Sequence, residues 1–141
     1  MKKQILMFFV AAGIMAGCQK EAVSENPLIG KWNWIKSVGG ITGNHEILPQ
    51  EGGKRTIEFF ENFTYRFTQT GPNPVTFSST YSITMLTDIQ TNEQKKALIL
   101  YDETMRPQIP MIFTIEDDEL KLKENCADCY TNYYRAVAQT Q

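Results

Sequence analysis

The sequence predicts an all-β protein in which eight antiparallel strands form an up-and-down barrel. Three observations predict this fold. Runs rich in Val, Ile, Thr, Phe and Tyr recur from Leu28 onward, turn-forming residues separate them at fairly even spacing, and no stretch shows a clear helical period. The 141 residues suffice for one domain, and 42% hydrophobic with 21% charged residues is typical of a globular protein. No apolar run in the sequence reaches the roughly 18 residues that a membrane span needs.

Residues that favour turns separate the predicted strands. Gly39-Gly40 ends the first strand, and Gly71-Pro72-Asn73-Pro74 reverses the chain between the third and the fourth. Glu61-Asn62 and Asp117-Asp118 are predicted to form tight hairpin turns. The predicted strands are residues 28–38, 56–60, 64–70, 76–85, 96–101, 109–116, 119–123 and 130–137.

Apolar and polar residues alternate along several of these strands, which gives each strand one face for a core. Met111, Phe113 and Ile115 share such a face. A meander of eight strands is large enough to close into a barrel, and closure removes the exposed strand edges. A β-sandwich is the competing fold. Side chains can fill the interior of an eight-stranded barrel, or the interior can hold one small ligand, and periodicity does not decide between these outcomes.

Residues 1–17 have the parts of a bacterial signal peptide. Lys2 and Lys3 provide a positive start, and the apolar stretch 5–15 leads into Met15-Ala16-Gly17-Cys18. Two small residues followed by cysteine resemble the lipobox of bacterial lipoproteins. This resemblance implies that the chain is cut before Cys18 and that Cys18 is diacylated, so that lipid holds the protein on a membrane. The alternative is an ordinary secretory signal with a chance cysteine.

Residues 18–27 are expected to be the lipidated cysteine and a linker to the folded domain. They are polar, contain Pro27 and lack periodicity. Gln19-Lys20-Glu21 resembles the short signal that sends lipoproteins of Bacteroidetes-type bacteria to the outer surface. These features predict a lipid anchor in the outer membrane. Display at the cell surface and attachment to the inner face of that membrane both remain open.

The two ends of the predicted barrel match a known family. Gly30-Lys31-Trp32 opens the first strand, and Arg135 lies in the last. This pattern resembles the lipocalins, in which the arginine lies over the tryptophan and closes one end of the barrel. Together with Gly39-Gly40 and the segment 126–135, it makes the domain 28–138 resemble the lipocalin-like domain of Bacteroidetes lipoproteins. The resemblance implies barrel-closing roles for Gly30, Trp32 and Arg135, but the helix that follows the barrel in many lipocalins is not evident.

Cys126 and Cys129 form a pair directly before the last predicted strand. A redox-active pair would need the start of a helix, where the helix dipole lowers the thiol pKa. A structural zinc site would need further ligands, and the sequence contains one histidine. The remaining alternatives are a structural disulfide, which export to an oxidising compartment favours, and two free thiols. We expect the disulfide.

No motif in the sequence indicates an enzyme, a metal site or a cofactor. His45 lies in a polar, glycine-containing segment without a nucleophile motif, so we expect a solvent-exposed loop residue. The acidic run 116–119 lacks the spaced acids and the glycine of a calcium loop. The formal net charge is −2 and the basic residues form no continuous face, so nucleic acid is not expected as a partner.

Aromatic residues concentrate on the central predicted strands. They are expected either to fill the core or to line a cup for a small apolar ligand. The expected function is therefore binding of a small hydrophobic ligand, or of an envelope protein partner, at a mouth formed by the loops 39–54, 72–74 and 87–94. The alternative is a structural or accessory lipoprotein with a filled barrel that acts through surface protein contacts. The candidate ligand-binding residues are Phe67, Phe77, Tyr81 and Phe113.

Overall fold

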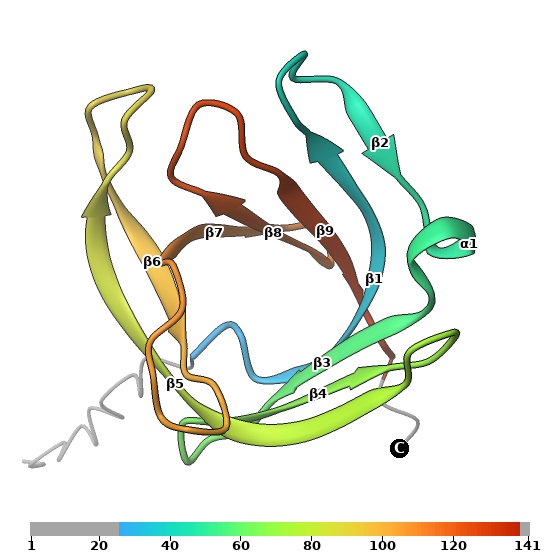
Figure 1. Ribbon diagram of the computed structural model, residues 1–141. Coiled ribbons are helices and arrows are strands. Elements are labelled where there is room, and N and C mark those ends of the chain that lie inside the picture. The colour runs from blue at the N-terminus through green and yellow to red at the C-terminus, as the bar shows by residue number, and fades with distance from the viewer. Residues whose placement is uncertain (1–25, 139–141) are drawn as a thin grey trace, which may run out of the picture.

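The computed structural model describes residues 26–138, which form one antiparallel sheet of nine strands (Figure 1). The strands follow the order β2-β1-β3-β4-β5-β6-β7-β8-β9, and β9 also pairs with β1. Eight strands therefore form a closed antiparallel barrel, and the predicted fold class is confirmed. The predicted signal peptide, Cys18 and the linker as far as residue 25 lie outside the described residues.

The eight predicted strands match the eight barrel strands, with ends that differ by no more than two residues. The short strand β2 and the one-turn helix α1 lie in a segment predicted as a loop, because three or four residues are too few to show a period. The elements are β1 Gly30–Gly39, β2 His45–Ile47, α1 Pro49–Gly52, β3 Arg55–Phe59, β4 Thr64–Gln69, β5 Val75–Thr87, β6 Gln94–Leu100, β7 Met111–Glu116, β8 Glu119–Glu124 and β9 Thr131–Ala136.

Neighbouring barrel strands run in opposite directions, so their connections alternate between the two ends of the barrel. The β3–β4 and β7–β8 connections leave from the end at which β1 begins, which we call the closed end, whereas the tip of the long β5–β6 hairpin contacts Asn125 of the β8–β9 connection. The β1–β3, β4–β5, β6–β7 and β8–β9 connections leave from the opposite end, which we call the open end. In the β7–β8 turn, Asp117 and Asp118 have φ values of 50° and 61°, as the predicted tight hairpin requires.

The hydrophobic core lies inside the barrel and consists of side chains at alternate strand positions. Aromatic rings pack against one another in it. The rings of Phe59 and Tyr81, for example, meet edge to face with their centroids 5.0 Å apart. Among the described residues, the core cluster and the side chains packed against it extend from Leu28 to Ala136.

The segment before β1 closes one end of the barrel. The side chain of Leu28 is completely buried, and its carbonyl accepts a hydrogen bond of 2.8 Å from Nε1 of Trp32. Asn26 donates to the hydroxyl of Tyr81 at 2.6 Å, and this hydroxyl donates to the carbonyl of Phe60 at 3.1 Å. Asn26 and Pro27, which were predicted as the end of the linker, therefore belong to the folded domain. The chain enters the barrel across its closed end.

The predicted stacking of Arg135 on Trp32 is wrong. Trp32 is 5% exposed and belongs to the core cluster, whereas Arg135 is exposed and pairs across the strands with the exposed Asn33. Because side chains alternate along β9, Tyr134 points into the barrel and Arg135 points out. The arginine that does lie over a core tryptophan is Arg55, whose Cζ is 4.5 Å from the centre of the Trp34 ring.

Gly30 has a backbone role at the closed end. Its φ of 128° lies in a region that residues with a side chain rarely adopt. No atom of a distant residue lies within 4 Å of the position that a Cβ would occupy, so close packing does not require a glycine here. Gly30 therefore allows the chain to turn from the segment that carries Leu28 into β1.

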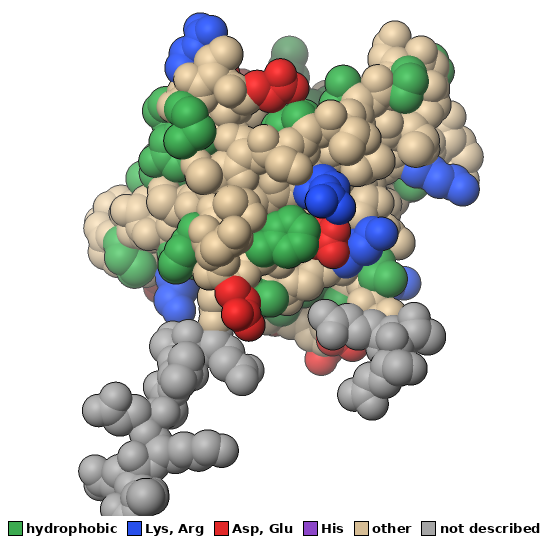
Figure 2. Space-filling model, turned by 90° about the horizontal axis from the view of Figure 1, so that it is seen from below, with side chains coloured by type: hydrophobic (Ala, Val, Ile, Leu, Met, Phe, Trp, Pro, Cys, Tyr) green, Lys and Arg blue, Asp and Glu red, His purple; other side chains and the backbone are tan. Residues whose placement is uncertain are grey.

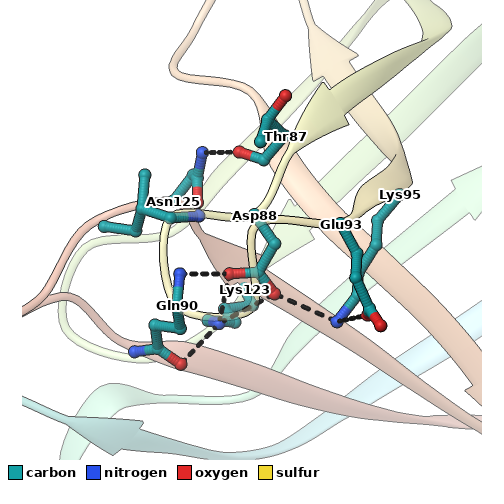
Figure 3. A network of polar contacts seen from close by, with 8 residues as sticks. Thr87, Asp88, Gln90, Glu93, Lys95, Lys123 and Asn125 are labelled. Atoms are coloured by element: carbon teal, nitrogen blue, oxygen red, sulfur yellow. Dashed lines mark hydrogen bonds and ion pairs between the residues drawn. The ribbon is translucent and has the colours of Figure 1, made fainter.

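The β5–β6 connection packs on the outer wall of the barrel through Asp88 (Figure 3). Although it is an acid, Asp88 is 2% exposed. Its carboxylate accepts hydrogen bonds from the backbone N–H of Gln90 at 2.9 Å, from Lys95 at 3.1 Å and from Lys123 of β8 at 3.3 Å. The neighbouring Asn125 donates to the carbonyl of Thr87 at 2.8 Å. These contacts join the tip of the β5–β6 hairpin to the end of β8.

The outer surface of the barrel is mixed in character. Figure 2, seen from below the view of Figure 1, shows hydrophobic side chains scattered among polar groups and charges of both signs. Arg66 on the outer face of β4 illustrates the pattern, since its guanidinium lies 5.8 Å from the centre of the Phe60 ring. Scattered apolar side chains are normal for a solvated surface. The interior and the ends of the barrel are therefore where a small ligand would find apolar surroundings.

Removal of the Leu28 side chain is expected to destabilise the protein. Leu28→Ala leaves a cavity at the closed end and should lower the free energy of unfolding by about 2–5 kcal/mol. Ile29→Ala is the matched control, because this neighbouring side chain is 39% exposed and its truncation should have a much smaller effect. Urea unfolding of both variants measures the difference. Equal losses would contradict the role of Leu28 in closing the barrel.

The Asp88 contacts predict a loss of stability in acid. The hydrogen bond from Gln90, with those from Lys95 and Lys123, lowers the pKa of Asp88 from 3.8 to about 2. Because this pKa is lower in the folded chain, the stabilisation is complete above the unfolded pKa and disappears as the pH falls from 3.8 towards 2.

Asp88→Asn should therefore be less stable than the unchanged protein at pH 7, and this difference should shrink between pH 3.8 and 2 in urea unfolding experiments. Asp128→Asn, at an exposed position in the β8–β9 connection, should match the unchanged protein at pH 7. A difference between Asp88→Asn and the unchanged protein that stays constant down to pH 2 would be inconsistent with this explanation.

Candidate functional site: a cavity at the open end

The open end of the barrel contains a cavity of about 350 Å³. Side chains from seven of the eight barrel strands line it, together with Gln108 from the β6–β7 connection. Its volume lies at the lower end of the range of about 300–1,000 Å³ that is usual for small-molecule sites. The lining residues are Ile57, Tyr65, Phe67, Phe77, Leu100, Gln108, Met111, Leu122, Glu124, Asn132 and Tyr134.

The inner part of the cavity is apolar and tightly packed. Ile57, Tyr65 and Leu122 are each no more than 2% exposed. The Tyr65 hydroxyl donates to the carbonyl of Tyr101 at 2.7 Å, and burial, with a smaller effect of the Asp102 charge, raises the pKa of Tyr65 to about 12. Burial likewise raises the pKa of Tyr134 to about 12, although the charge of Arg55 opposes this change. Both phenols are therefore neutral at physiological pH.

A short chain of hydrogen bonds, which we call the relay, fixes the position of Asn132, a polar residue that lines the cavity. Trp34 donates from Nε1 to the hydroxyl of Ser37 at 3.0 Å, and this hydroxyl donates to Oδ1 of Asn132 at 2.5 Å. A β-bulge between Trp34 and Lys36 makes the relay possible. In a regular strand, residues 34 and 37 would face opposite sides, whereas the extra residue turns both inward. Because its Oδ1 is occupied, Asn132 presents its amide N–H groups as donors.

Arg55 lies next to this relay at the start of β3. It is in phase with Ile57 and Phe59, whose side chains point into the barrel. Its guanidinium lies over the ring of Trp34, and its Nε donates to Oε1 of Gln69 on the paired strand β4 at 3.1 Å. The position of this arginine is therefore fixed by an aromatic face and an amide.

Two of the four predicted ligand-binding residues line the cavity. Phe67 and Phe77 lie on its wall, and their rings contact each other with centroids 5.5 Å apart. Tyr81 and Phe113 do not line it. They line a separate pocket of about 520 Å³ beside Asn26 and Pro27 at the closed end. The difference arises because inward-facing residues near the two ends of one strand contact different parts of the interior.

The loops at the mouth also differ in part from the prediction. The β1–β3 and β4–β5 connections, which contain residues 40–54 and 70–74, leave from the open end as expected. The β5–β6 connection packs against the β8–β9 connection through Asn125 and contributes no residue to the lining of the cavity. The β6–β7 connection, residues 101–110, lies at the mouth instead and contributes Gln108 to the cavity.

Cys126 and Cys129 form a disulfide in the β8–β9 connection, with their Cα atoms 5.5 Å apart. This confirms the expected pairing. Gly39 at the end of β1 packs directly against this connection, because a Cβ there would overlap the carbonyl oxygen of Cys129 and lie 2.7 Å from Cα of Tyr130. Glu124 lies close to both sulfur atoms. Sulfurs that share a disulfide are not thiolates, so the three groups do not form a metal site in this state.

His45 is exposed, as predicted, but it is the first residue of β2 rather than part of a loop. Its Nδ1 lies 3.0 Å from the hydroxyl of Tyr130. This contact connects β2 to the β8–β9 connection across the open end.

The polar residues at the mouth were not predicted from the sequence. Arg55, Gln69 and Glu124 each continue an alternating pattern that begins with apolar residues, namely Ile57, Phe67 and Leu122. Their positions in this alternation could have identified them as inward-facing residues. Asn132 offered a weaker signal, because its contact with Ser37 depends on the bulge in β1.

Comparison with known proteins identifies no relative. No family model, no curated protein and no solved structure matches the chain. Among the described residues, no helix has the length and apolar character that crossing a bilayer would require.

Truncation of Ser37 tests the relay behind the cavity wall. Ser37→Ala leaves the buried Nε1 of Trp34 without its acceptor, and the free energy of unfolding should fall by about 1–3 kcal/mol. Ser78→Ala, on the exposed side of β5, makes the same chemical change and should be nearly neutral. Urea unfolding compares the two. If both variants were as stable as the unchanged protein, the relay would have no structural importance.

Proposed function

We propose that this protein is a lipid-anchored envelope protein that binds one small, largely apolar molecule in the open end of its barrel. The cavity of about 350 Å³ is the observation that carries the proposal. Aromatic and aliphatic side chains line its inner part, and a few polar groups lie at its mouth. This combination is typical of small-molecule sites, in which the apolar wall supplies affinity and the polar groups supply orientation.

The proposed membrane attachment rests on the resemblance of Met15-Ala16-Gly17-Cys18 to a lipobox. The described chain begins at Asn26 on the closed end, opposite the cavity. A lipid on Cys18 would therefore join the domain at its closed end. Such an anchor leaves the mouth accessible to a ligand that arrives from the aqueous phase. An outer-membrane lipoprotein with a lipocalin-like domain, as the resemblance implies, fits this arrangement.

Titration with the neutral dye N-phenyl-1-naphthylamine tests the proposal. The dye fluoresces strongly in apolar surroundings, and the chain from Gln19 onward is suitable because it contains the complete core of the barrel. We expect saturable binding of one dye molecule. Phe67→Gln should weaken this binding about tenfold, because it removes an apolar wall of the cavity.

Phe63→Gln is the matched control. Phe63 is 52% exposed and lines the pocket at the closed end, so its replacement should leave the dye affinity unchanged if the open-end cavity is the site. A loss of affinity in Phe63→Gln alone would instead place the dye at the closed end. A folded protein that binds no dye would favour an accessory protein that acts through its surface.

A further inference from the structure

Next to the cavity lies an arginine, Arg55, that has no acidic partner in the part of the chain that the structure describes. The ion pairs of these residues involve Lys36, Lys95, Arg106, Lys121 and Lys123, and none involves Arg55. A charge that faces the interior of a barrel is costly to desolvate unless it is paired or hydrogen-bonded. Arg55 therefore differs from an ordinary surface arginine.

The position of Arg55 is next to the cavity. On β3 and β4 the pair Ile57 and Phe67 lines the cavity, and Arg55 and Gln69 form the next inward-facing pair towards the open end. The ring of Trp34 lies on one face of the guanidinium. Arg55 is also close enough to Tyr134, another cavity residue, for its charge to affect the pKa of that phenol.

Most of the donors of Arg55 remain available to a ligand. A guanidinium has five N–H donors, and the hydrogen bond to Gln69 uses the one on Nε. The remaining N–H groups form a planar fork that matches the two oxygens of a carboxylate. Because Trp34 and Gln69 already hold the side chain, binding an anion would require little further ordering. Asn132, whose Oδ1 is occupied by Ser37, adds a neutral donor to the same cavity.

Glu124 is the acidic residue among those that line the cavity. It lies on β8, which is three strand positions from β3 around the wall, with β9 and β1 between them. It also borders a second, outer groove, so it lies at the rim. The charges of Arg55 and Glu124 are therefore on separate parts of the mouth. An anionic group is favoured on the Arg55 side, and the apolar body of a ligand is favoured deeper inside.

We propose that the ligand is an amphipathic anion, whose apolar chain or ring occupies the cavity and whose carboxylate or similar acidic group binds Arg55. This inference rests on the proposed function, since it names the class of molecule that the cavity takes. It predicts that the protein distinguishes an acid from an alcohol with the same carbon chain.

Displacement of N-phenyl-1-naphthylamine by decanoate and by 1-decanol at pH 7 tests the inference. Both compounds carry the same chain, and decanoate alone is charged. Hydrogen bonds between charged groups are stronger than those between neutral groups, so the chain from Gln19 onward should bind decanoate at least about tenfold more tightly than decanol. Arg55→Gln should remove this preference and leave the affinity for decanol within about twofold.

Arg66→Gln is the matched control. Arg66 also lies near an aromatic ring, but on the outer face of β4, so this variant should keep the preference for decanoate. Arg55→Lys, which retains the charge and loses the planar fork, should keep part of the preference and provides a second variant if Arg55→Gln does not fold.

Three results would overturn the inference while leaving the proposed function intact. They are dye binding without a preference for decanoate, an equal preference in Arg55→Gln, or the same loss in Arg66→Gln. The absence of saturable dye binding to the folded protein would instead refute the proposed function itself. The two failures are thus distinguishable in one set of titrations.

Discussion

The pairing of β1 with β9 is the interaction on which the rest of the structure depends. It joins the first and last barrel strands and converts a meander into a closed wall, so the terminal strands do not remain as unpaired edges. Closure also creates an interior, in which the alternate residues of every strand meet. The bulge that interrupts this pairing near Trp34 turns Ser37 inward and so builds part of the cavity wall.

The two ends of the barrel differ because, among the described residues, the segment before β1 covers one of them. Leu28 is buried at the closed end, and Asn26 donates a hydrogen bond to Tyr81 beside the pocket there. The open end is bordered by longer connections and by polar residues, and a cavity remains there. The proposed lipid anchor near the N-terminus and the mouth at the opposite end are compatible with the proposed role as a tethered binding protein. The inward-facing Arg55 gives that mouth a chemical preference.

Local patterns predicted the barrel strands closely because each strand exposes one face and buries the other, which produces alternation in the sequence. The barrel-closing role predicted for Arg135 was incorrect because the same alternation was not applied to β9. Arg135 follows the inward-facing Tyr134 directly and must therefore point outward. Arg55 is in phase with Ile57 and Phe59, so the same alternation, applied to polar residues, would have identified it. Of the four predicted ligand-binding residues, Phe67 and Phe77 line the open-end cavity, whereas Tyr81 and Phe113 line the pocket at the closed end.

The sequence by itself determined the strands, their turns and the disulfide pair, because these features depend on neighbouring residues. Its short motifs also resemble those of lipidated, lipocalin-like proteins. The tertiary structure decided which tryptophan an arginine covers, which end of the barrel is filled and where the cavity lies. These features depend on strand register and on closure, which bring Arg55 to Trp34 and Ser37 to Asn132. A period of two residues defines the side of a strand on which a residue lies, but not its height in the barrel, and that height separates core from binding site.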